Sequence, residues 1–319
     1  MKDGAINFGE PQTDMMHDRL ARRSLIAGAL ALVVAPVWAA ERPKVVATFS
    51  VLGDMIGRIA GDKVQLTTIV GGDGDCELYQ PTAADAGAVA VARLFVMNGL
   101  NPRFEPWAEG LLKRADFRGT RLVASQGVNV IIDDRPRGVA KGTQYDQHAW
   151  HDPANGLVYV ANIAEGLTQV DPANAAFYRT QAESYAGEIR AVDAWARTEF
   201  SAVPSAKRRV ITSHDGFEYF ARAYDIEMTP ARGKVNDADP SADDIARLIQ
   251  QIRSTGVKAI FIENMNDPRL IKRVAREAGA TIGGELYSDS LSKPGGEADT
   301  YLKMIRHNVS TLKAAMLKN

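Results

Sequence analysis

Residues 171–200 read DPANAAFYRTQAESYAGEIRAVDAWARTEF, a stretch in which Pro172 is the only proline and Gly187 the only glycine. Asp171 suits an N-cap, and Pro172 would occupy the first helical position. The pattern predicts a helix of about 28–30 residues, roughly 42–45 Å long at about 1.5 Å per residue. Such a helix is either a long surface helix or a rigid strut that joins two lobes. Its apolar side chains recur at roughly helical spacing, at Phe177, Tyr185, Ile189, Val192 and Trp195.

Strands alternate with helices on both sides of this segment. Before it, apolar runs predict strands at Lys44–Phe49, Val64–Val70, Leu94–Met97 and Arg121–Ala124. Helical spacing follows the first and third of these strands, at Val51–Ile59 and Phe104–Leu112. After it, strands are predicted at Arg209–Thr212 and Lys258–Glu263, and helices at Pro268–Ala278 and Thr300–Leu317. This alternation is typical of mostly parallel sheets.

We therefore predict an α/β protein with two doubly wound lobes joined by a long, rigid linking helix. The expected boundaries are an N-terminal lobe at residues 41–170, the linking helix at 171–203 and a C-terminal lobe at 204–319. Ligands of open α/β sheets bind beyond the carboxyl ends of the strands. The cleft between the two lobes is therefore the expected site.

Composition excludes several classes of protein. Of the 319 residues, 45% are hydrophobic and 24% are charged, which is ordinary for a globular chain and unlike a disordered, collagen-like or coiled-coil protein. The formal net charge of −1 gives no overall field that would attract nucleic acid. A single cysteine, Cys76, excludes an intrachain disulfide framework and every metal site with several cysteines.

The first forty residues have the pattern of an export signal. Arg22 and Arg23 precede an uncharged stretch, 24–38, and the small residues Ala39 and Ala40 follow it. We expect cleavage near Ala39/Ala40 and a mature protein in the periplasm, without insertion in the membrane, because the uncharged stretch is too short to span about 30 Å. A buried N-terminal helix is the alternative. Translation from Met15 or Met16 would give a cleaner signal, and general secretory or twin-arginine export stays open.

Four polar positions follow strands or close loops on the side of the expected cleft. His148 lies three residues before His151 in QHAWHD (147–152), and His214 follows the strand that ends at Thr212. Asp289 follows the apolar stretch that ends at residue 286, and Glu77 follows the strand 64–70. Each signal alone is weak, because a helix cap or a turn is the commoner role. Together, two imidazoles and two carboxylates can form a four-coordinate metal site without thiolate.

Short motifs along the mature chain resemble the metal-binding periplasmic proteins of zinc and manganese ABC importers, in which a rigid helix joins two lobes. The order and spacing of the motifs together carry the resemblance, which covers essentially all of the mature chain. The motifs are ATFS (47–50), YQPT (79–82), QHAW (147–150), SHDGF (213–217), FIE (261–263) and LYSDSL (286–291).

The resemblance implies one metal ligand in each of four segments: Glu77, His148, His214 and Asp289. The family pattern has a histidine two residues before the Tyr-x-Pro segment, where this chain has Glu77. A glutamate can bind zinc, although it favours harder ions such as manganese. Cys76 could instead supply a thiolate, or be a small buried side chain. His151 is unusual for the family, and could be a further donor or a neighbour of the ligands.

The function that the resemblance implies is capture of one divalent metal, Zn²⁺ first and Mn²⁺ next, and delivery to the membrane permease of an ABC importer. We expect a monomer without enzymatic activity or nucleic-acid partner. One alternative is a secreted zinc metallohydrolase, with Glu263 or Asp215 as general base, although the chain has no G-x-S-x-G or HExxH motif. The other is a metal-free structural or adhesive relative.

Overall fold

The computed structural model describes residues 41–133, 144–231, 246, 249–250, 252–254, 257, 259–265 and 268–318. The predicted export signal, 1–40, lies outside the described residues. Within them, no helix combines the length and the apolar character that a membrane span requires.

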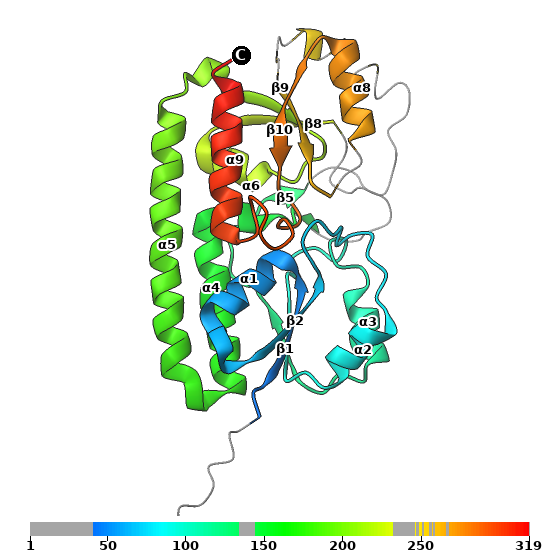
Figure 1. The fold of residues 1–319 in the computed structure, drawn as a ribbon, viewed down its shortest axis with the longest axis vertical. Helices are drawn as coiled ribbons and strands as arrows, with labels where there is room; N and C mark the ends of the chain where they lie inside the picture. Colours follow the sequence, from blue (N-terminus) through cyan, green and yellow to red (C-terminus); the bar gives the residue numbers. More distant parts are fainter. Residues whose placement is uncertain are drawn as a thin grey trace, which may run out of the picture. The chain divides into compact units, whose positions relative to one another are not determined.

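The first sheet is parallel, with the strand order β2-β1-β3-β4. Its strands are β1 (Lys44–Phe49), β2 (Gln65–Val70), β3 (Leu94–Met97) and β4 (Thr120–Val123). The helices of this part are α1 (Ser50–Ala60), α2 (Ala83–Ala90), α3 (Ala108–Arg114) and α4 (Pro153–Val170). Figure 1 shows α1 and α4 on one side of the sheet and α2 and α3 on the other.

The second sheet is also parallel, with the order β10-β9-β7-β8. Its strands are β7 (Arg209–Thr212), β8 (Glu227–Pro230), β9 (Ala259–Glu263) and β10 (Thr281–Leu286). The helices of this part are α6 (Glu218–Tyr224), α8 (Arg269–Ala278) and α9 (Tyr301–Met316). Two parallel α/β sheets confirm the predicted fold class.

One helix prediction needs correction at its start. The helix expected at Phe104–Leu112 begins only at Ala108. Glu105 turns inward instead, and its carboxylate accepts hydrogen bonds from the backbone N–H groups of Asn98, at 2.9 Å, and Gly99, at 3.0 Å. The chain around Glu105 therefore forms turns that close the loop after β3.

The long helix is α5 (Ala175–Ser201), 27 residues in length. A short 3-10 turn, Pro172–Asn174, precedes it, so Asp171 is not its N-cap. The Asp171 carboxylate instead accepts a hydrogen bond from the Tyr178 hydroxyl at 2.6 Å. Helix α5 packs against α1 and α4 beside the first sheet and against α9 beside the second. The lobe boundaries at 170/171 and 203/204 stay predictions.

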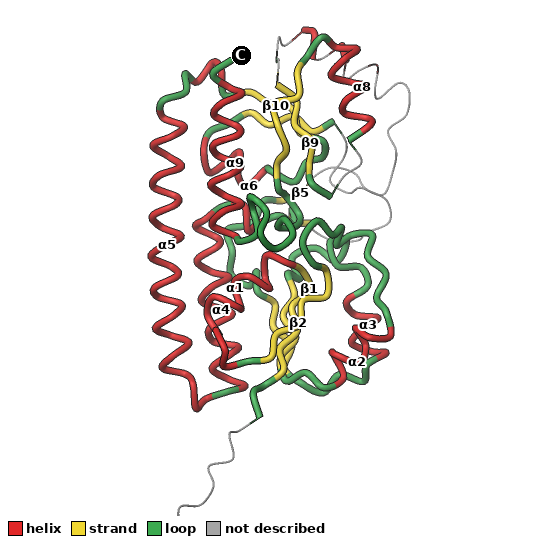
Figure 2. Tube along the Cα trace, in the orientation of Figure 1, coloured by secondary structure: helices red, strands yellow, loops and turns green. Residues whose placement is uncertain are grey.

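Loops gather between the two sheets, as Figure 2 shows. They include the two-stranded antiparallel pair β5 (Ile132–Asp133) and β6 (Gln144–Tyr145) and the 3-10 turn η2 (Ala149–His151). The carboxyl-terminal ends of the strands therefore lead into one region of loops, where a ligand site is expected.

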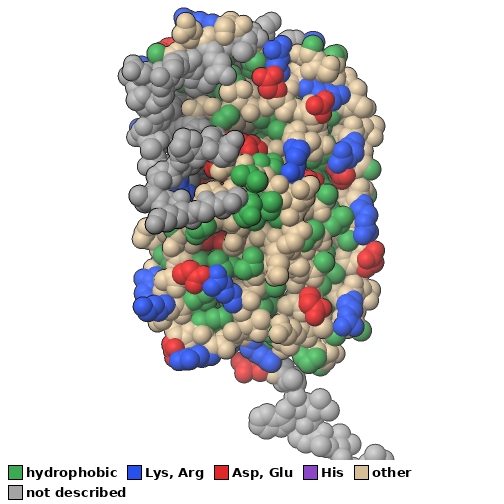
Figure 3. Space-filling model, turned by 180° about the vertical axis from the view of Figure 1, so that it is seen from behind, with side chains coloured by type: hydrophobic (Ala, Val, Ile, Leu, Met, Phe, Trp, Pro, Cys, Tyr) green, Lys and Arg blue, Asp and Glu red, His purple; other side chains and the backbone are tan. Residues whose placement is uncertain are grey.

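On the face of the molecule drawn in Figure 3, acidic and basic side chains are interspersed.

Candidate metal site

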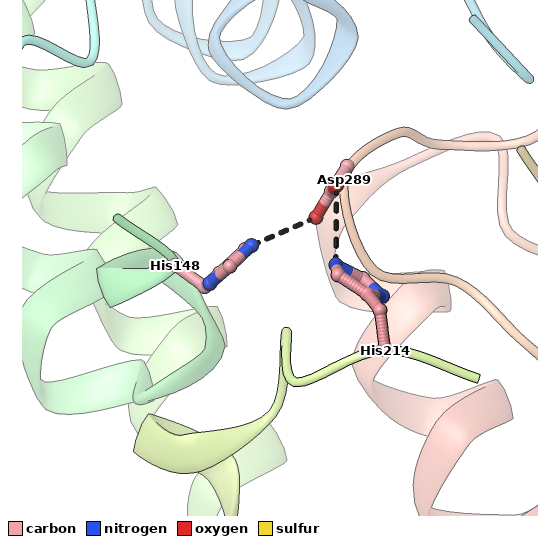
Figure 4. A group of neighbouring side chains, drawn as sticks. All are labelled: His148, His214 and Asp289. Atoms are coloured by element: carbon pink, nitrogen blue, oxygen red, sulfur yellow. Dashed lines mark ion pairs between the residues drawn. The ribbon is translucent and has the colours of Figure 1, made fainter. Parts of the chain in front are cut away.

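Three of the four predicted ligands meet in this region of loops. His148 immediately precedes η2, His214 lies two residues after β7, and Asp289 lies three residues after β10. All three side chains are fully buried. Figure 4 shows the three side chains converging from separate loops. The fold therefore brings together residues that are far apart in the sequence.

The ligand atoms of these residues lie close enough to share one ion. His148 Nε2 is 3.3 Å from Asp289 Oδ1, and His214 Nε2 is 3.4 Å from Asp289 Oδ2. One ligand atom from each residue can be chosen so that all three lie within 4.8 Å of one another. We call His148, His214 and Asp289 the metal cluster.

A carboxylate supports each histidine of the metal cluster from behind. Asp146 Oδ1 lies 2.9 Å from His148 Nδ1 and accepts a hydrogen bond from the His148 backbone N–H at 2.8 Å. Glu263 Oε2 lies 2.5 Å from His214 Nδ1, and its Oε1 accepts a hydrogen bond from the His214 backbone N–H at 3.0 Å. A carboxylate at Nδ1 favours the tautomer that leaves the Nε2 lone pair for a metal.

Buried polar atoms without hydrogen bonds are rare and call for an explanation. Within the described part of the chain, no well-aligned hydrogen bond reaches Nε2 of His148, Nε2 of His214 or either carboxylate oxygen of Asp289, although these groups lie at ion-pair distance from one another. Two imidazole nitrogens and one carboxylate are the donor set that borderline divalent transition metals accept. The residues present therefore fit such a cation.

Without a metal, the cluster holds protons. Burial disfavours the charged form of His148, but the carboxylates of Asp146 and Asp289 outweigh it and raise the pKa of His148 to about 10. Burial likewise opposes the charge of His214, while Glu263 and Asp289 raise the pKa of His214. Burial opposes ionisation of Asp289 as well, but His214 and His148 lower the pKa of Asp289. A divalent cation would replace protons here.

Glu77, the fourth predicted ligand, is buried but does not belong to the metal cluster. Its carboxylate accepts a hydrogen bond from the side-chain amide of Gln147, the neighbour of His148 in sequence. The turn that carries Glu77 is closed by Asp75, whose Oδ1 accepts the backbone N–H groups of Glu77 at 2.9 Å and Leu78 at 3.0 Å. Burial raises the pKa of Asp75, and the charge of Asp289 adds to this.

Cys76 has the surroundings of an inert thiol. Its side chain is fully buried, and its backbone carbonyl accepts a hydrogen bond from Trp107 Nε1 at 2.8 Å. Burial first, and then the charge of Glu105, raise the pKa of the Cys76 thiol. Because the thiolate is the form that binds metals, these surroundings disfavour Cys76 as a ligand.

His151 is buried but is not one of the three residues of the metal cluster. Its Nε2 lies 3.1 Å from the carbonyl oxygen of Ser288. Burial, and then the neighbouring charge of His148, lower the pKa of His151 to about 3.

The roles of Asp146 and Glu263 escape the sequence analysis. Asp146 lies two residues before His148, and Glu263 ends a buried apolar strand. A carboxylate at the end of such a strand is a signal that could have been read, because burial of an unpartnered charge is costly. The sequence alone suggests Glu263 only as part of the FIE motif and as the general base of the alternative hydrolase. In the structure it accepts hydrogen bonds from two serine hydroxyls and lies beside His214 Nδ1.

Comparison with known proteins agrees with this geometry. The family model described as zinc-uptake complex component A, periplasmic, matches residues 45–315. A metal ABC transporter substrate-binding lipoprotein of Streptococcus sanguinis is 31% identical over 279 residues, covering 86% of this chain and 89% of the relative. A manganese ABC transporter substrate-binding lipoprotein of Streptococcus pneumoniae is 30% identical over 282 residues, covering 87% and 90%.

A solved structure shares the fold. The periplasmic zinc-binding protein TroA of Treponema pallidum matches with a TM-score of 0.78 at 27% identity, covering 86% of this chain and 99% of that chain. The predicted two-lobe α/β fold and the predicted family are thereby confirmed, and the family consists of binding proteins rather than enzymes. The chain belongs to the zinc-uptake complex component A family, the periplasmic substrate-binding proteins of metal ABC transporters.

Proposed function

We propose that this protein captures one divalent transition metal in the periplasm, zinc first and manganese next, and delivers it to the permease of an ABC importer. The observation that carries the proposal is the metal cluster, in which two imidazole nitrogens and one carboxylate converge without hydrogen bonds of their own. Metal is here the cargo of the protein. We further propose that the exported protein acts as a monomer after cleavage near Ala39/Ala40.

The proposed ligand set is His148, His214, Asp289 and Glu77. To complete the set, Glu77 would give up its hydrogen bond with Gln147 and bind the ion instead. That hydrogen bond supports the assignment, because Gln147 is the neighbour of His148 in sequence. Asp289 presents one oxygen to each histidine, so it can bind through one oxygen or both. The set thus offers two nitrogens and up to four oxygens.

The choice between zinc and manganese depends on how many oxygens reach the ion. Zinc accepts four ligands in a tetrahedron, which two histidines and two single carboxylate oxygens supply. Manganese accepts more oxygens, which bidentate binding by Asp289 and Glu77 would supply. Several relatives are named for manganese and one solved structure for zinc, so both ions occur in the names of similar proteins. Two imidazoles supported by carboxylates favour zinc here, because such support raises the basicity of the nitrogen ligands.

Metal content decides between the ions and tests the proposal. The mature protein is stripped with a chelator, offered equimolar Zn²⁺ and Mn²⁺, and measured by native mass spectrometry with elemental analysis. One zinc per chain is the expected result, and one manganese retained against zinc would reverse the preference. No bound metal and no thermal shift with either ion would refute capture and favour the metal-free structural relative.

Variants of the protein test the fourth ligand. Glu77→Gln should weaken zinc binding far more than Asp75→Asn, because Asp75 already closes the turn through two backbone N–H groups. The reverse order would assign the fourth position to Asp75. Equal binding by the wild type and Glu77→Gln would leave a three-ligand site, the kind that catalytic zinc enzymes use.

A further inference from the structure

We infer that His151 is a positioning residue that, together with Trp150, holds the backbone of Ser288 and thereby aims the Asp289 carboxylate at the metal. The inference rests on the proposed function. It concerns a histidine that binds no metal itself but lies on the same 3-10 turn, η2, that follows the ligand His148.

Two donors from this turn meet one carbonyl oxygen. Trp150 Nε1 donates to the Ser288 carbonyl at 3.0 Å, and His151 Nε2 lies 3.1 Å from the same oxygen. A carbonyl oxygen only accepts hydrogen bonds, so His151 Nε2 carries the proton and donates it. The carbonyl has two lone pairs, and the two donors use both. The peptide unit that precedes Asp289 is therefore fixed from the side of His148.

Packing holds the His151 ring in place for this bond. The ring lies 4.7 Å, centroid to centroid, from Phe217 at an interplanar angle of 39°, and 5.6 Å from Trp150. Only 1% of His151 is exposed. Its lowered pKa keeps the ring neutral at physiological pH, so it adds no positive charge beside the cation site.

Ser288 is held from its other side by the support of His214. Its hydroxyl donates to Glu263 Oε2 at 2.6 Å, the same oxygen that lies 2.5 Å from His214 Nδ1. The residue before Asp289 is thus bonded both to the turn that follows His148 and to the carboxylate behind His214. A shift of Ser288 would change the distance of Asp289 from both histidines at once.

An apolar side chain at position 151 would leave the Ser288 carbonyl with the Trp150 bond alone. The carbonyl could then rotate, and the carboxylate one residue later would lose its fixed direction. Partners that orient metal ligands typically change metal affinity by about 10- to 100-fold when they are removed. We expect His151→Leu to weaken zinc binding within this range and to speed zinc release.

The test compares three variants with the wild type. His151→Leu removes the donor, and His151→Gln restores an N–H at a similar reach. His307→Leu is the matched control, because His307 Nε2 also lies near a backbone carbonyl, that of Glu285 at 2.9 Å on strand β10, and His307 is not part of the metal cluster. Zinc affinity is measured by competition with a chromophoric chelator, and ligand geometry by the visible absorption of the Co²⁺-loaded protein.

The expected result is a zinc dissociation constant raised about tenfold or more in His151→Leu, largely recovered in His151→Gln and unchanged in His307→Leu. The Co²⁺ spectrum should change in His151→Leu alone. If His151→Leu does not fold, Trp150→Phe removes the other donor to the same carbonyl and should give the same loss of affinity.

The inference would be overturned if His151→Leu had wild-type zinc affinity and an unchanged Co²⁺ spectrum. The same holds for Trp150→Phe where that variant replaces it. Either result would leave the proposed function intact. Equal loss in His151→Leu and His151→Gln with the wild-type Co²⁺ spectrum would also overturn it, because that pattern indicates packing alone. A wild-type protein that binds neither Zn²⁺ nor Co²⁺ would refute the proposed function and the inference with it.

Discussion

Replacing Glu263 by glutamine changes a buried carboxylate into an amide of nearly the same shape. In the wild type, Oε1 accepts from the Ser213 hydroxyl at 2.8 Å and the His214 backbone N–H at 3.0 Å. The other oxygen accepts from the Ser288 hydroxyl and faces His214 Nδ1. In Glu263→Gln, an amide N–H would occupy one of these two oxygen positions. The amide oxygen is most stable at the position of Oε1, where it keeps the hydrogen bonds from the Ser213 hydroxyl and the His214 backbone N–H. The amide N–H then lies against the Ser288 hydroxyl and His214 Nδ1.

The expected losses follow from these contacts. The Ser288 hydroxyl can rotate and accept, but His214 Nδ1 can accept only if the ring proton moves to Nε2, where the metal should bind. Loss of the close contact between the Glu263 carboxylate and His214 Nδ1, counted as one charged hydrogen bond, should lower the free energy of unfolding of the metal-free protein by about 1.5–3 kcal/mol. The wrong tautomer should weaken zinc binding by about 10- to 100-fold, which is about 1.4–2.8 kcal/mol of binding free energy.

Urea unfolding of the stripped protein and calorimetric zinc titration measure the two losses separately. Glu297→Gln is the matched control, since Glu297 lies 3.3 Å from Nδ1 of His307 but its side chain is 77% exposed. The control should change the unfolding free energy by less than about 0.5 kcal/mol, as exposed positions usually do. Wild-type zinc affinity in Glu263→Gln would refute the assignment of Glu263 as the support of His214.

Two further predictions concern the ligands. His148→Ala and His214→Ala should each weaken zinc binding well beyond about 100-fold, the upper end expected for supporting residues. Cys76→Ala should bind zinc like the wild type in the same titration. Loss of zinc binding in Cys76→Ala would make the thiolate a ligand. The thermal shift produced by Zn²⁺ should grow from pH 6 to pH 8. The pKa of His148 is raised to about 10 in the metal-free protein, so its stabilising charge is fully present below about pH 6.5 and is lost as the pH rises towards 10. Zinc must displace that proton, so binding strengthens with pH; a shift that does not change with pH in differential scanning fluorimetry would contradict histidine ligation.

The strands and the metal cluster were largely predictable because local signals identify them. β1 and β3 are apolar runs with the predicted bounds, Lys44–Phe49 and Leu94–Met97. His214 and Asp289 lie just beyond strands β7 and β10, and parallel strands end at one edge of a sheet. The position of a candidate ligand relative to the end of a strand is thus readable from sequence alone.

Features that depend on contacts distant in sequence were not predictable. The late start of α3 follows from Glu105, whose carboxylate bonds to the backbone after β3 rather than pointing to solvent along a helix. Glu77 is likewise placed by Gln147, 70 residues away. Helical spacing and motif position describe neither contact, because both arise only after the loops have come together.

Helix α5 has a mechanical consequence for transport. It is one unbroken helix of 27 residues, about 40 Å long, packed along α4 beside the first sheet and α9 beside the second. A large rotation of one sheet away from the other would have to separate α5 from α4 or from α9 along much of its length. We therefore expect metal binding to order the loops between the two sheets rather than to rotate one lobe. A permease that distinguishes loaded from empty protein would then recognise how rigid these loops are, not how far a lobe has moved.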